Sequence, residues 1–353
     1  KKSLKIVGIV IGILLLAVIG LLLWLTVTEY KPEAVEVVSV SGFKEKSAPA
    51  VGDPLKIVSL NTGYGGLGKE SDFFMDGGTG VKPKQSQVLE NVGGILSILQ
   101  EQNADICLLQ EVDRDSTRTY KMEQGVAYRT QLERLFFTTS ALNYSCDFVP
   151  YPWPPIGKVH SGVQTLSGFT IDRAERIALP CPFKWPVSTA NLKRCLLVSY
   201  VPLENSDKQL VLVNLHLEAY DDGEGKIIQT KMLMEFLTAE YEKGNYVIAG
   251  GDFNQTFPGA LDAYPIKNTD FWTPGVLESD ILPEGWQFAY DLTVPSCRLL
   301  NQPYDPESPD TQSYVIDGFI LSPNVEVKKV ETLDAQFTYT DHNPVILEAA
   351  LSS

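Results

Sequence analysis

The sequence predicts an α/β fold, a four-layer sandwich of two packed mixed β-sheets flanked by helices, preceded by one N-terminal transmembrane helix. Helical and strand-like patterns alternate early in the chain, whereas strands cluster later, and this order favours two mixed sheets covered by helices. The chain has 353 residues, of which 44% are apolar, enough for a sizeable core. A long uncharged stretch near the N-terminus completes the prediction.

That uncharged stretch is 23 residues long, IVGIVIGILLLAVIGLLLWLTVT, between Lys5 and Glu29. At about 1.5 Å per helical residue it exceeds the ~30 Å hydrocarbon core of a bilayer. Residues 1–29 are therefore expected to form a cytoplasmic tip and a membrane anchor. Lys1, Lys2 and Lys5 precede the span, so the positive-inside rule predicts a single-pass cell-membrane protein with a cytoplasmic N-terminus and an extracytoplasmic domain. A cleaved signal peptide is the alternative, but the stretch is long for one and no small-x-small cleavage site follows it.

The next segment, residues 30–54, contains proline and serine and is weakly periodic, which indicates a stalk. No second linker follows, so residues 55–353 are expected to form one catalytic domain. Its first elements are a strand at Leu55–Asn61, a helix at about 84–102, a strand at 105–110 and a helix at about 122–140.

The later part of the chain is richer in apolar and alternating strand patterns. Strands are expected at 161–171, 192–201, 209–217, 246–250, 314–321, 325–333 and 345–350, and a helix at 226–243. Three segments are expected to be long loops: 63–80, 148–159 and 253–309. Long connections in a compact domain are often functional. Tyr151 and Trp153, among the prolines of the second loop, suit either a rigid cover for the core or a membrane-interface wedge.

Charge and cysteine content narrow the class of protein. Residues 50–353 hold 23 basic and 40 acidic side chains, a net charge of −17. Proteins that bind duplex DNA through many phosphates are usually basic over their footprint, so long-range capture of duplex DNA is disfavoured. The five cysteines are too few and too irregular for a disulfide framework or a zinc motif, although export would permit a bridge between Cys181 and Cys195.

Short polar runs stand at the ends of several apolar, β-branched stretches. They are SLN with Asn61, LQEVD with Glu111, NLHL with His216, GDFN with Asp252 and Asn254, ID with Asp317, and TDHNP with Asp341 and His342. A packed scaffold can hold side chains rigidly at strand ends, where catalytic groups often lie. Six such runs in one chain predict a catalytic constellation, whereas any single one is a weak signal.

In this order, the six runs resemble the motifs of the endonuclease/exonuclease/phosphatase superfamily, which includes deoxyribonuclease I, apurinic endonucleases and neutral sphingomyelinases. The resemblance covers essentially residues 55–351. It implies hydrolysis of a phosphoester with the help of Mg²⁺ or Mn²⁺, hard cations that prefer oxygen ligands. Glu111 is the expected metal ligand, Asn61 supplies an amide oxygen or orients the water shell, and Asp341 completes the set. The alternative for Asp341 is a turn cap before Asn343 and Pro344.

The same resemblance implies roles for the remaining residues. Asp252 would accept a proton from water and Asn254 would donate to a phosphate oxygen, both from one face if the strand end stays extended; an Asx turn is the alternative. His342 would meet the phosphate as an imidazolium held by Asp317. His216 is a second donor and candidate general acid. Family nucleases often carry a Glu or Asn near His160, and its absence here leaves the partner of His216 open.

Arg114, Arg118 and His160 are candidate substrate-binding residues, although a solvated charged loop explains the two arginines equally well. The function predicted is a membrane-anchored, divalent-metal-dependent phosphoester hydrolase, specifically a phosphodiesterase acting on nucleic acid or on lipid head groups. The alternatives are a phosphomonoesterase of the inositol-phosphate type and a catalytically silent extracellular binding module. The partners expected are the phosphoester and the membrane, with no obligate protein partner.

Overall fold

The protein is built on two seven-stranded mixed β-sheets, as seen in a computed structural model that describes residues 2–42, 47–221 and 223–352. In order across the first sheet lie β17 (Val325–Thr332), β18 (Val345–Leu351), β3 (Pro54–Asn61), β4 (Ile106–Asp113), β6 (Gly157–Ser167), β5 (Phe137–Val149) and β2 (Val40–Ser41). In order across the second lie β1 (Val35–Val38), β7 (Arg173–Ala178), β8 (Cys195–Pro202), β9 (Gln209–His216), β10 (Tyr246–Asp252), β16 (Asp317–Leu321) and β13 (Gln287–Ala289).

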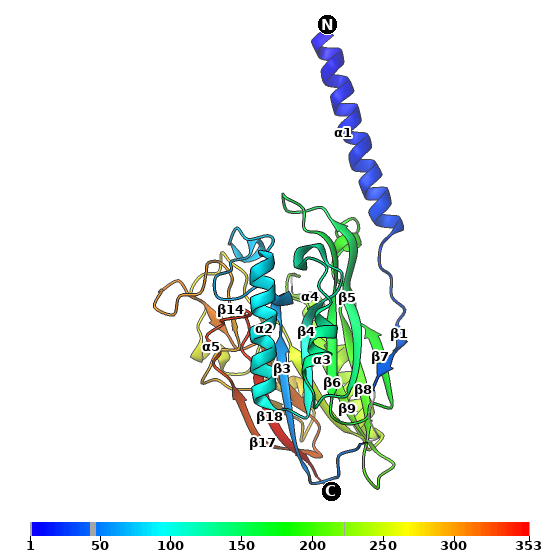
Figure 1. Ribbon diagram of the computed structural model, residues 1–353, viewed down its shortest axis with the longest axis vertical. Helices are drawn as coiled ribbons and strands as arrows, with labels where there is room; N and C mark the ends of the chain where they lie inside the picture. Colours follow the sequence, from blue (N-terminus) through cyan, green and yellow to red (C-terminus); the bar gives the residue numbers. More distant parts are fainter. Residues whose placement is uncertain (1, 43–46, 222, 353) are drawn as a thin grey trace.

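Helices cover the outer faces of the two sheets (Figure 1). Helices α2 (Gln85–Gln102) and α3 (Gln124–Gln131) pack on the first sheet, where Val58 and Leu60 of β3 meet Val92 of α2. Helix α4 (Glu224–Glu242) packs on the second sheet, where Leu233 meets Val213 of β9. The arrangement is helix, sheet, sheet, helix, and it confirms the predicted four-layer α/β sandwich.

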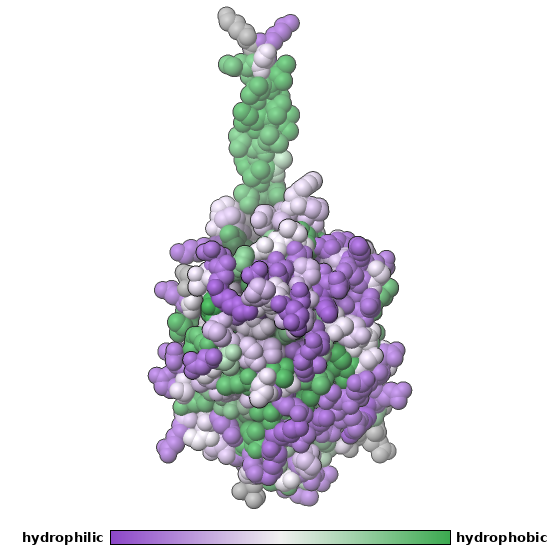
Figure 2. All heavy atoms as spheres, turned by 90° about the vertical axis from the view of Figure 1, so that its left-hand side faces the viewer, coloured by the Kyte–Doolittle hydropathy of each residue, from purple (hydrophilic) through white to green (hydrophobic). Residues whose placement is uncertain are grey.

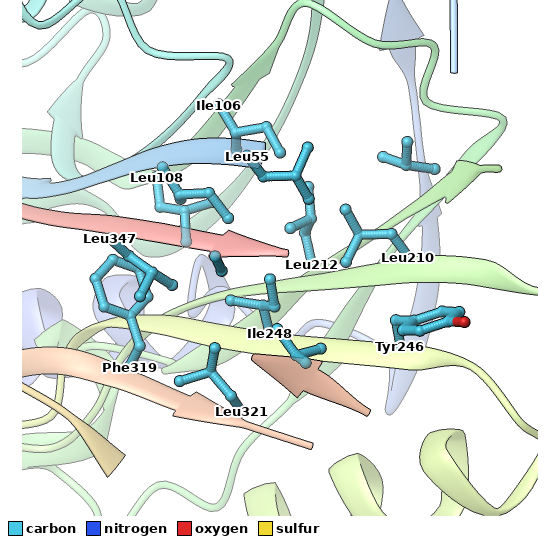
Figure 3. Close-up of a cluster of buried hydrophobic side chains, with 14 of the residues drawn as sticks. Leu55, Ile106, Leu108, Leu210, Leu212, Tyr246, Ile248, Phe319, Leu321 and Leu347 are labelled. Atoms are coloured by element: carbon cyan, nitrogen blue, oxygen red, sulfur yellow. The ribbon is translucent and has the colours of Figure 1, made fainter. Parts of the chain in front are cut away.

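The inner core lies between the two sheets and follows from strand alternation. Side chains two apart on a strand point to the same face, so Leu55 and Ile57 of β3 face inward while Val58 and Leu60 face α2. Leu212 of β9 meets them from the second sheet. Figure 3 shows this interdigitation, which fixes the two sheets against each other and with them the strand ends that carry polar groups.

Helix α1 (Lys2–Val27) stands out from one end of the domain, whereas the C-terminus lies at the opposite end (Figure 1). Its most apolar stretch has a mean hydropathy of 3.2 and is not buried against the domain. Figure 2 shows these hydrophobic side chains fully uncovered. The helix is long and apolar enough to cross a membrane. Of the basic residues expected before the span, Lys2 and Lys5 lie on the helix and Lys1 falls outside the described residues.

The segment expected to be a stalk joins the domain instead of standing apart from it. Residues 30–54 include β1, which pairs with β7 of the second sheet, and β2, which pairs with β5 of the first. Glu29 forms an ion pair with Lys193 at 2.8 Å just after α1 ends. The domain therefore begins within a few residues of the helix, with one edge strand of each sheet donated by this segment.

The prediction of a helix at 122–140 is wrong for the second half of that range. Helix α3 ends at Gln131, and Phe137 begins the long strand β5. Aromatic and β-branched residues, Phe136 to Thr139, stand at this junction, and antiparallel pairing with β6 along the whole strand outweighs the helical spacing before it. The expected loop at 148–159 is the tip of the β5–β6 hairpin, and β6 begins at Gly157, four residues before the predicted strand.

Two further differences concern short elements. Strand β7, which pairs with β8, was not predicted as a separate strand. The expected loop at 253–309 contains β13 and five small elements: β11 (Gln255–Thr256), α5 (Ala260–Ala263), β12 (Gly275–Val276), the 3-10 helix η5 (Ser279–Ile281) and β14 (Cys297–Arg298). Strands of two or three residues carry no periodicity, so tertiary contacts decide them.

Candidate active site

Seven of the predicted site residues come together at one end of the sandwich. We call Asn61, Glu111, His216, Asp252, Asp317, Asp341 and His342 the acid–histidine cluster. Asn61, His216 and Asp252 are the last residues of β3, β9 and β10, and Asp317 is the first of β16. Because β16 runs antiparallel to β10, its first residue lies at the same end as the last residue of β10. All seven are buried except Glu111, whose side chain is a quarter exposed.

The second sheet supplies a row of three residues. Asp252 is the register partner of His216 on one side and of Asp317 on the other. Nε2 of His216 lies 3.4 Å from Oδ2 of Asp252. Adjacent strands are about 4.8 Å apart, so this row is a direct consequence of three strands ending together.

The first sheet supplies Asn61 and Glu111. The β4–β6 register shifts between Leu109 and Val112, and Glu111 has a φ of +54°. Such a bulge turns a side chain away from the regular alternation of its strand, and here it directs Glu111 into the cluster. Nδ2 of Asn61 donates to Oε1 of Glu111 at 3.2 Å and to Oδ2 of Asp252 at 3.0 Å, which links the two sheets.

His342 and Asp317 form a tight pair. Nδ1 of His342 lies 2.8 Å from Oδ2 of Asp317, and its Nε2 lies 3.8 Å from Asp252. Burial alone would lower the pKa of His342, but the carboxylate of Asp317, with Cys297 and Asp341, raises that pKa well above its ordinary value. The contact with Asp317 therefore favours the imidazolium form of His342, whose Nε2 lies 3.8 Å from Asp252 and 3.9 Å from Asp341.

His216 has the opposite electrostatic character. Burial, followed by the positive charges of Arg194 and His342, lowers its pKa well below the ordinary value. Its Nδ1 has no hydrogen-bond partner among the described residues. A neutral imidazole can donate one hydrogen bond but carries no proton to give as an acid near neutral pH. The opposite directions of the two pKa shifts thus favour His342 over His216 as the source of a proton.

Asp252 and Asn254 do not share one extended face. Asn254 has a φ of +51°, its backbone N–H donates to Oδ1 of Asp252 at 2.9 Å, and its Nδ2 donates to the Leu217 carbonyl at 2.9 Å. This is an Asx turn, the alternative weighed for this motif. The turn ends β10 and holds the Asp252 carboxylate in place, while one N–H of the Asn254 amide remains for a ligand.

The chemistry of the cluster fits a hard divalent cation. Burial raises the pKa of Asp341 to about 6, and burial with the charge of Asp317 raises that of Asp252 above its ordinary value. A cation beside these carboxylates would remove that penalty, because it stabilises their charged forms. Cys297 and His342 also lie within ligand spacing of Asp341, but a buried thiol with a pKa of about 12 and an imidazolium are poor ligands.

The oxygen groups are therefore the better candidates to hold the ion. They are Glu111 and Asp341, with Asp252 close by. Oδ1 of Asn61 accepts the Gly63 N–H at 3.0 Å while its Nδ2 faces the carboxylates. This orientation suits the water-shell role predicted for Asn61 more than direct ligation.

The raised pKa of Asp341 gives a pH prediction for the metal-free chain. Between the ordinary value of 3.8 and about 6, the folded chain retains a proton that the unfolded chain has released, so raising the pH across this interval lowers the free energy of unfolding. In Asp341→Asn, whose side chain cannot titrate, we expect the free energy of unfolding to decrease less over the same pH interval. Urea unfolding of both chains in EDTA at several pH values measures this, and parallel pH dependences would contradict it.

The three predicted substrate-binding residues, Arg114, Arg118 and His160, take no part in the contacts that join the acid–histidine cluster. The guanidinium of Arg118 is buried, makes two hydrogen bonds to Asp113 at 3.0 and 2.9 Å, and stacks over Tyr64. Its charge is thus already paired within the fold. Arg114 donates its backbone N–H to His160, whose Nε2 lies 3.8 Å from Asp147. Neither has a hydrogen bond or ion pair to the cluster within the described residues, and their part in substrate binding stays a prediction.

Sequence reasoning missed several residues that position the cluster. Nε2 of Gln110 donates to Oδ1 of Asn214 at 2.8 Å between the sheets, and Oγ of Ser296 donates to Oδ2 of Asp317 at 2.8 Å. A polar residue inside an apolar strand was the available signal for Gln110 and Asn214. Ser296 lies in an irregular segment and gave no signal.

The fold and this cluster define a member of a known enzyme class. The family model described as "Endonuclease/Exonuclease/phosphatase family" matches residues 91–342, more than half of the chain. The chain belongs to the endonuclease/exonuclease/phosphatase family, as the motif resemblance predicted. No curated protein matches it in a sequence comparison.

Solved structures show the same fold at low sequence identity. An endonuclease/exonuclease/phosphatase from Beutenbergia cavernae aligns with a TM-score of 0.60 at 14% identity, covering 85% of this chain and 72% of its own. A family protein from Leptotrichia buccalis aligns at 0.54 and 14%, covering 84% and 100%. ANGEL2, a 2',3'-cyclic phosphatase, aligns at 0.53 and 14%, covering 91% and 100%. At this identity the likeness concerns the fold alone.

Proposed function

We propose that the protein is a membrane-anchored, divalent-metal-dependent phosphoester hydrolase, and specifically a phosphodiesterase. The observation that carries the proposal is the convergence of Asn61, Glu111, His216 and Asp252, from four separate strands, and of His342, just before β18, onto one end of the sandwich. Family membership supports the hydrolase class. The cyclic phosphatase ANGEL2 has the same fold, which is compatible with diester chemistry.

In this proposal each side chain has a distinct task. Glu111 and Asp341 would hold Mg²⁺ or Mn²⁺, which supplies charge neutralisation at the phosphate. Asp252 accepts the proton of the attacking water. His342, kept protonated by Asp317, donates to a phosphate oxygen, and His216 donates a second hydrogen bond as a neutral imidazole. Asn254 holds Asp252 through its backbone N–H, and its amide, which donates one N–H to the Leu217 carbonyl, would offer the second to a phosphate oxygen.

Helix α1 supports the membrane-anchored part of the proposal. Its length and hydropathy suit a bilayer span, and the basic residues at its start favour an extracytoplasmic domain. The net charge of −17 over residues 50–353 works against polyanionic substrates captured from a distance.

The test is a substrate panel with the full chain in bilayer nanodiscs, with and without EDTA. The panel holds bis(p-nitrophenyl) phosphate, plasmid DNA, RNA, phospholipid, sphingomyelin and inositol phosphates. We expect EDTA-sensitive cleavage of at least one diester. Cleavage of monoesters alone would move the assignment to a phosphomonoesterase. A folded chain that cleaves nothing would point to a binding module and refute the proposal.

A further inference from the structure

The foot of α1 and the acid–histidine cluster lie at the same end of the sandwich. Leu25 of α1 packs against Cys146 and Val149 of β5 and against Val159 of β6. Strand β5 is antiparallel to β6, which is antiparallel to β4, so β5 and β4 run toward the same end of the sandwich. Asp113, two residues after Glu111, is level with Tyr144 of β5 through Ser161 of β6, and β5 continues beyond that level to Val149. Strand β18 starts just after His342 and runs toward the C-terminus, away from α1 (Figure 1). A bilayer crossed by α1 therefore faces the cluster.

Exposed apolar side chains gather at this end from three separate segments. Tyr151 is 70% exposed and Trp153 is 88% exposed at the tip of the β5–β6 hairpin, while Trp185 is 60% exposed before a short 3-10 helix. Val187 of that helix and Met75 are also exposed. We call Met75, Tyr151, Trp153, Trp185 and Val187 the apolar rim. Leaving these large apolar side chains exposed to water does not stabilise the fold. A cluster of them on the surface therefore marks the rim as a contact surface.

The rim is physically joined to the end of the membrane helix. Nε1 of Trp185 donates to Oγ1 of Thr26 in the last turn of α1 at 3.0 Å. Phe74, next to Met75, packs with Leu25 of the same helix and contacts the Tyr151 ring at a centroid distance of 5.7 Å. The rim thus continues the apolar surface of α1 onto the domain, at the level where the helix leaves the hydrocarbon.

The composition of the rim fits the head-group region of a lipid bilayer. Tryptophan and tyrosine are enriched there because each ring has an apolar body and a polar edge. Lys184, beside Trp185, is exposed and can meet lipid phosphates in a domain that is otherwise strongly acidic. Bases of single-stranded nucleic acid can also stack on exposed rings, but the net charge of −17 over residues 50–353 disfavours a polyanion there.

We propose that the apolar rim rests in the head-group layer of the bilayer spanned by α1, and that the acid–histidine cluster acts on the phosphoester of a lipid head group in that same membrane. The inference rests on the proposed function and names its substrate class. It explains why the domain begins directly after α1: a long free tether would not hold the strand ends against the lipid surface.

The membrane contact is tested by tryptophan quenching in the full chain. The protein is placed in vesicles with lipids brominated near the head group, and emission is compared among wild type, Trp153→Phe, Trp185→Phe and Trp286→Phe. We expect the first two variants to lose quenchable emission. Trp286, buried beside Tyr241 at the other end of the second sheet, is the matched control, and its loss should leave the quenchable emission unchanged.

Trp24 in the last turns of α1 reports separately on the anchor. Quenching of Trp24 without quenching of Trp153 and Trp185 would mean that the helix is inserted but the rim stands off the bilayer, and this would overturn the inference while leaving the anchored hydrolase intact. If Trp24 also escapes quenching, the anchor itself is absent and both proposals fail.

The substrate class is tested with rim variants whose fold is verified by circular dichroism. Trp153→Ser should lower hydrolysis of lipid head groups in vesicles about tenfold, because burial of a large aromatic ring at the interface is lost. Hydrolysis of soluble bis(p-nitrophenyl) phosphate should not change. Val37→Ser is the control, since Val37 is 84% exposed on β1 at the side of the domain.

Three outcomes would overturn the substrate assignment. They are equal loss in Trp153→Ser on both substrates, no loss on vesicles, and cleavage of DNA or RNA without cleavage of any lipid. Absence of every hydrolytic activity would instead refute the proposed function, and the quenching pattern would then still decide whether the rim touches the membrane.

Discussion

Asp252→Asn is expected to lower the turnover of a phosphodiester by a factor of about 10²–10⁴, the usual contribution of a positioned general base. Asparagine keeps the size of the side chain and an oxygen that can accept the Asn254 N–H, so the turn after β10 is preserved. What is lost is the group that accepts a proton from water. The neutral amide cannot take this role at any pH.

The measurement is kcat and KM on bis(p-nitrophenyl) phosphate with saturating Mg²⁺. Loss confined to kcat identifies a contact made in the transition state. Asp262→Asn, an exposed carboxylate on α5, is the matched control and should retain full activity. Unchanged kcat in Asp252→Asn, with a fold verified by circular dichroism, would show that another group accepts the proton.

Glu111→Gln is expected to weaken Mg²⁺ binding about a hundredfold or more, because replacing even the outer partners of metal ligands commonly costs 10- to 100-fold. The change removes one negative charge but keeps the backbone contact at the bulge of β4, where the Glu111 carbonyl accepts the Thr62 hydroxyl at 3.0 Å. Activity should therefore fall strongly at low Mg²⁺ and recover in part at high Mg²⁺.

Thermal unfolding gives an independent readout of the same site. An ion that binds only the folded chain stabilises it by about 2.7 kcal/mol at a hundred times its Kd. The melting temperature of wild type should rise when Mg²⁺ is added, whereas that of Glu111→Gln should rise little at the same Mg²⁺ concentration. Glu90→Gln, on the exposed face of α2, should respond like wild type. Equal gains in all three chains would place the ion elsewhere.

The strand ends were predictable because their signal is local. Apolar, β-branched runs that stop at Asn61, His216 and Asp252 mark buried strands, and the matching ends of neighbouring strands meet at one edge of a sheet. The order of the motifs along the chain likewise indicates the family. Strand β5 was not predictable in the same way, because its pairing with β6 is decided by residues brought together in three dimensions.

The finer features of the site depend on backbone geometry that periodicity does not encode. The bulge at Glu111 and the left-handed turn at Asn254 are single-residue deviations from a regular strand. The opposite pKa shifts of His216 and His342 arise from neighbours far apart in the chain, Arg194 for one and Asp317 for the other. That α1 and the cluster lie at the same end of the sandwich likewise follows from sheet topology.

Metal-dependent hydrolysis by the full chain tests the central claim most directly. The rate on bis(p-nitrophenyl) phosphate is measured after EDTA treatment and again after Mg²⁺ is restored, in wild type and in Glu111→Gln. We predict that wild type loses activity with EDTA and regains it with Mg²⁺, while Glu111→Gln does not regain it at the same Mg²⁺ concentration. Activity that survives EDTA, or equal recovery in the two chains, would contradict a metal site at this end of the sandwich.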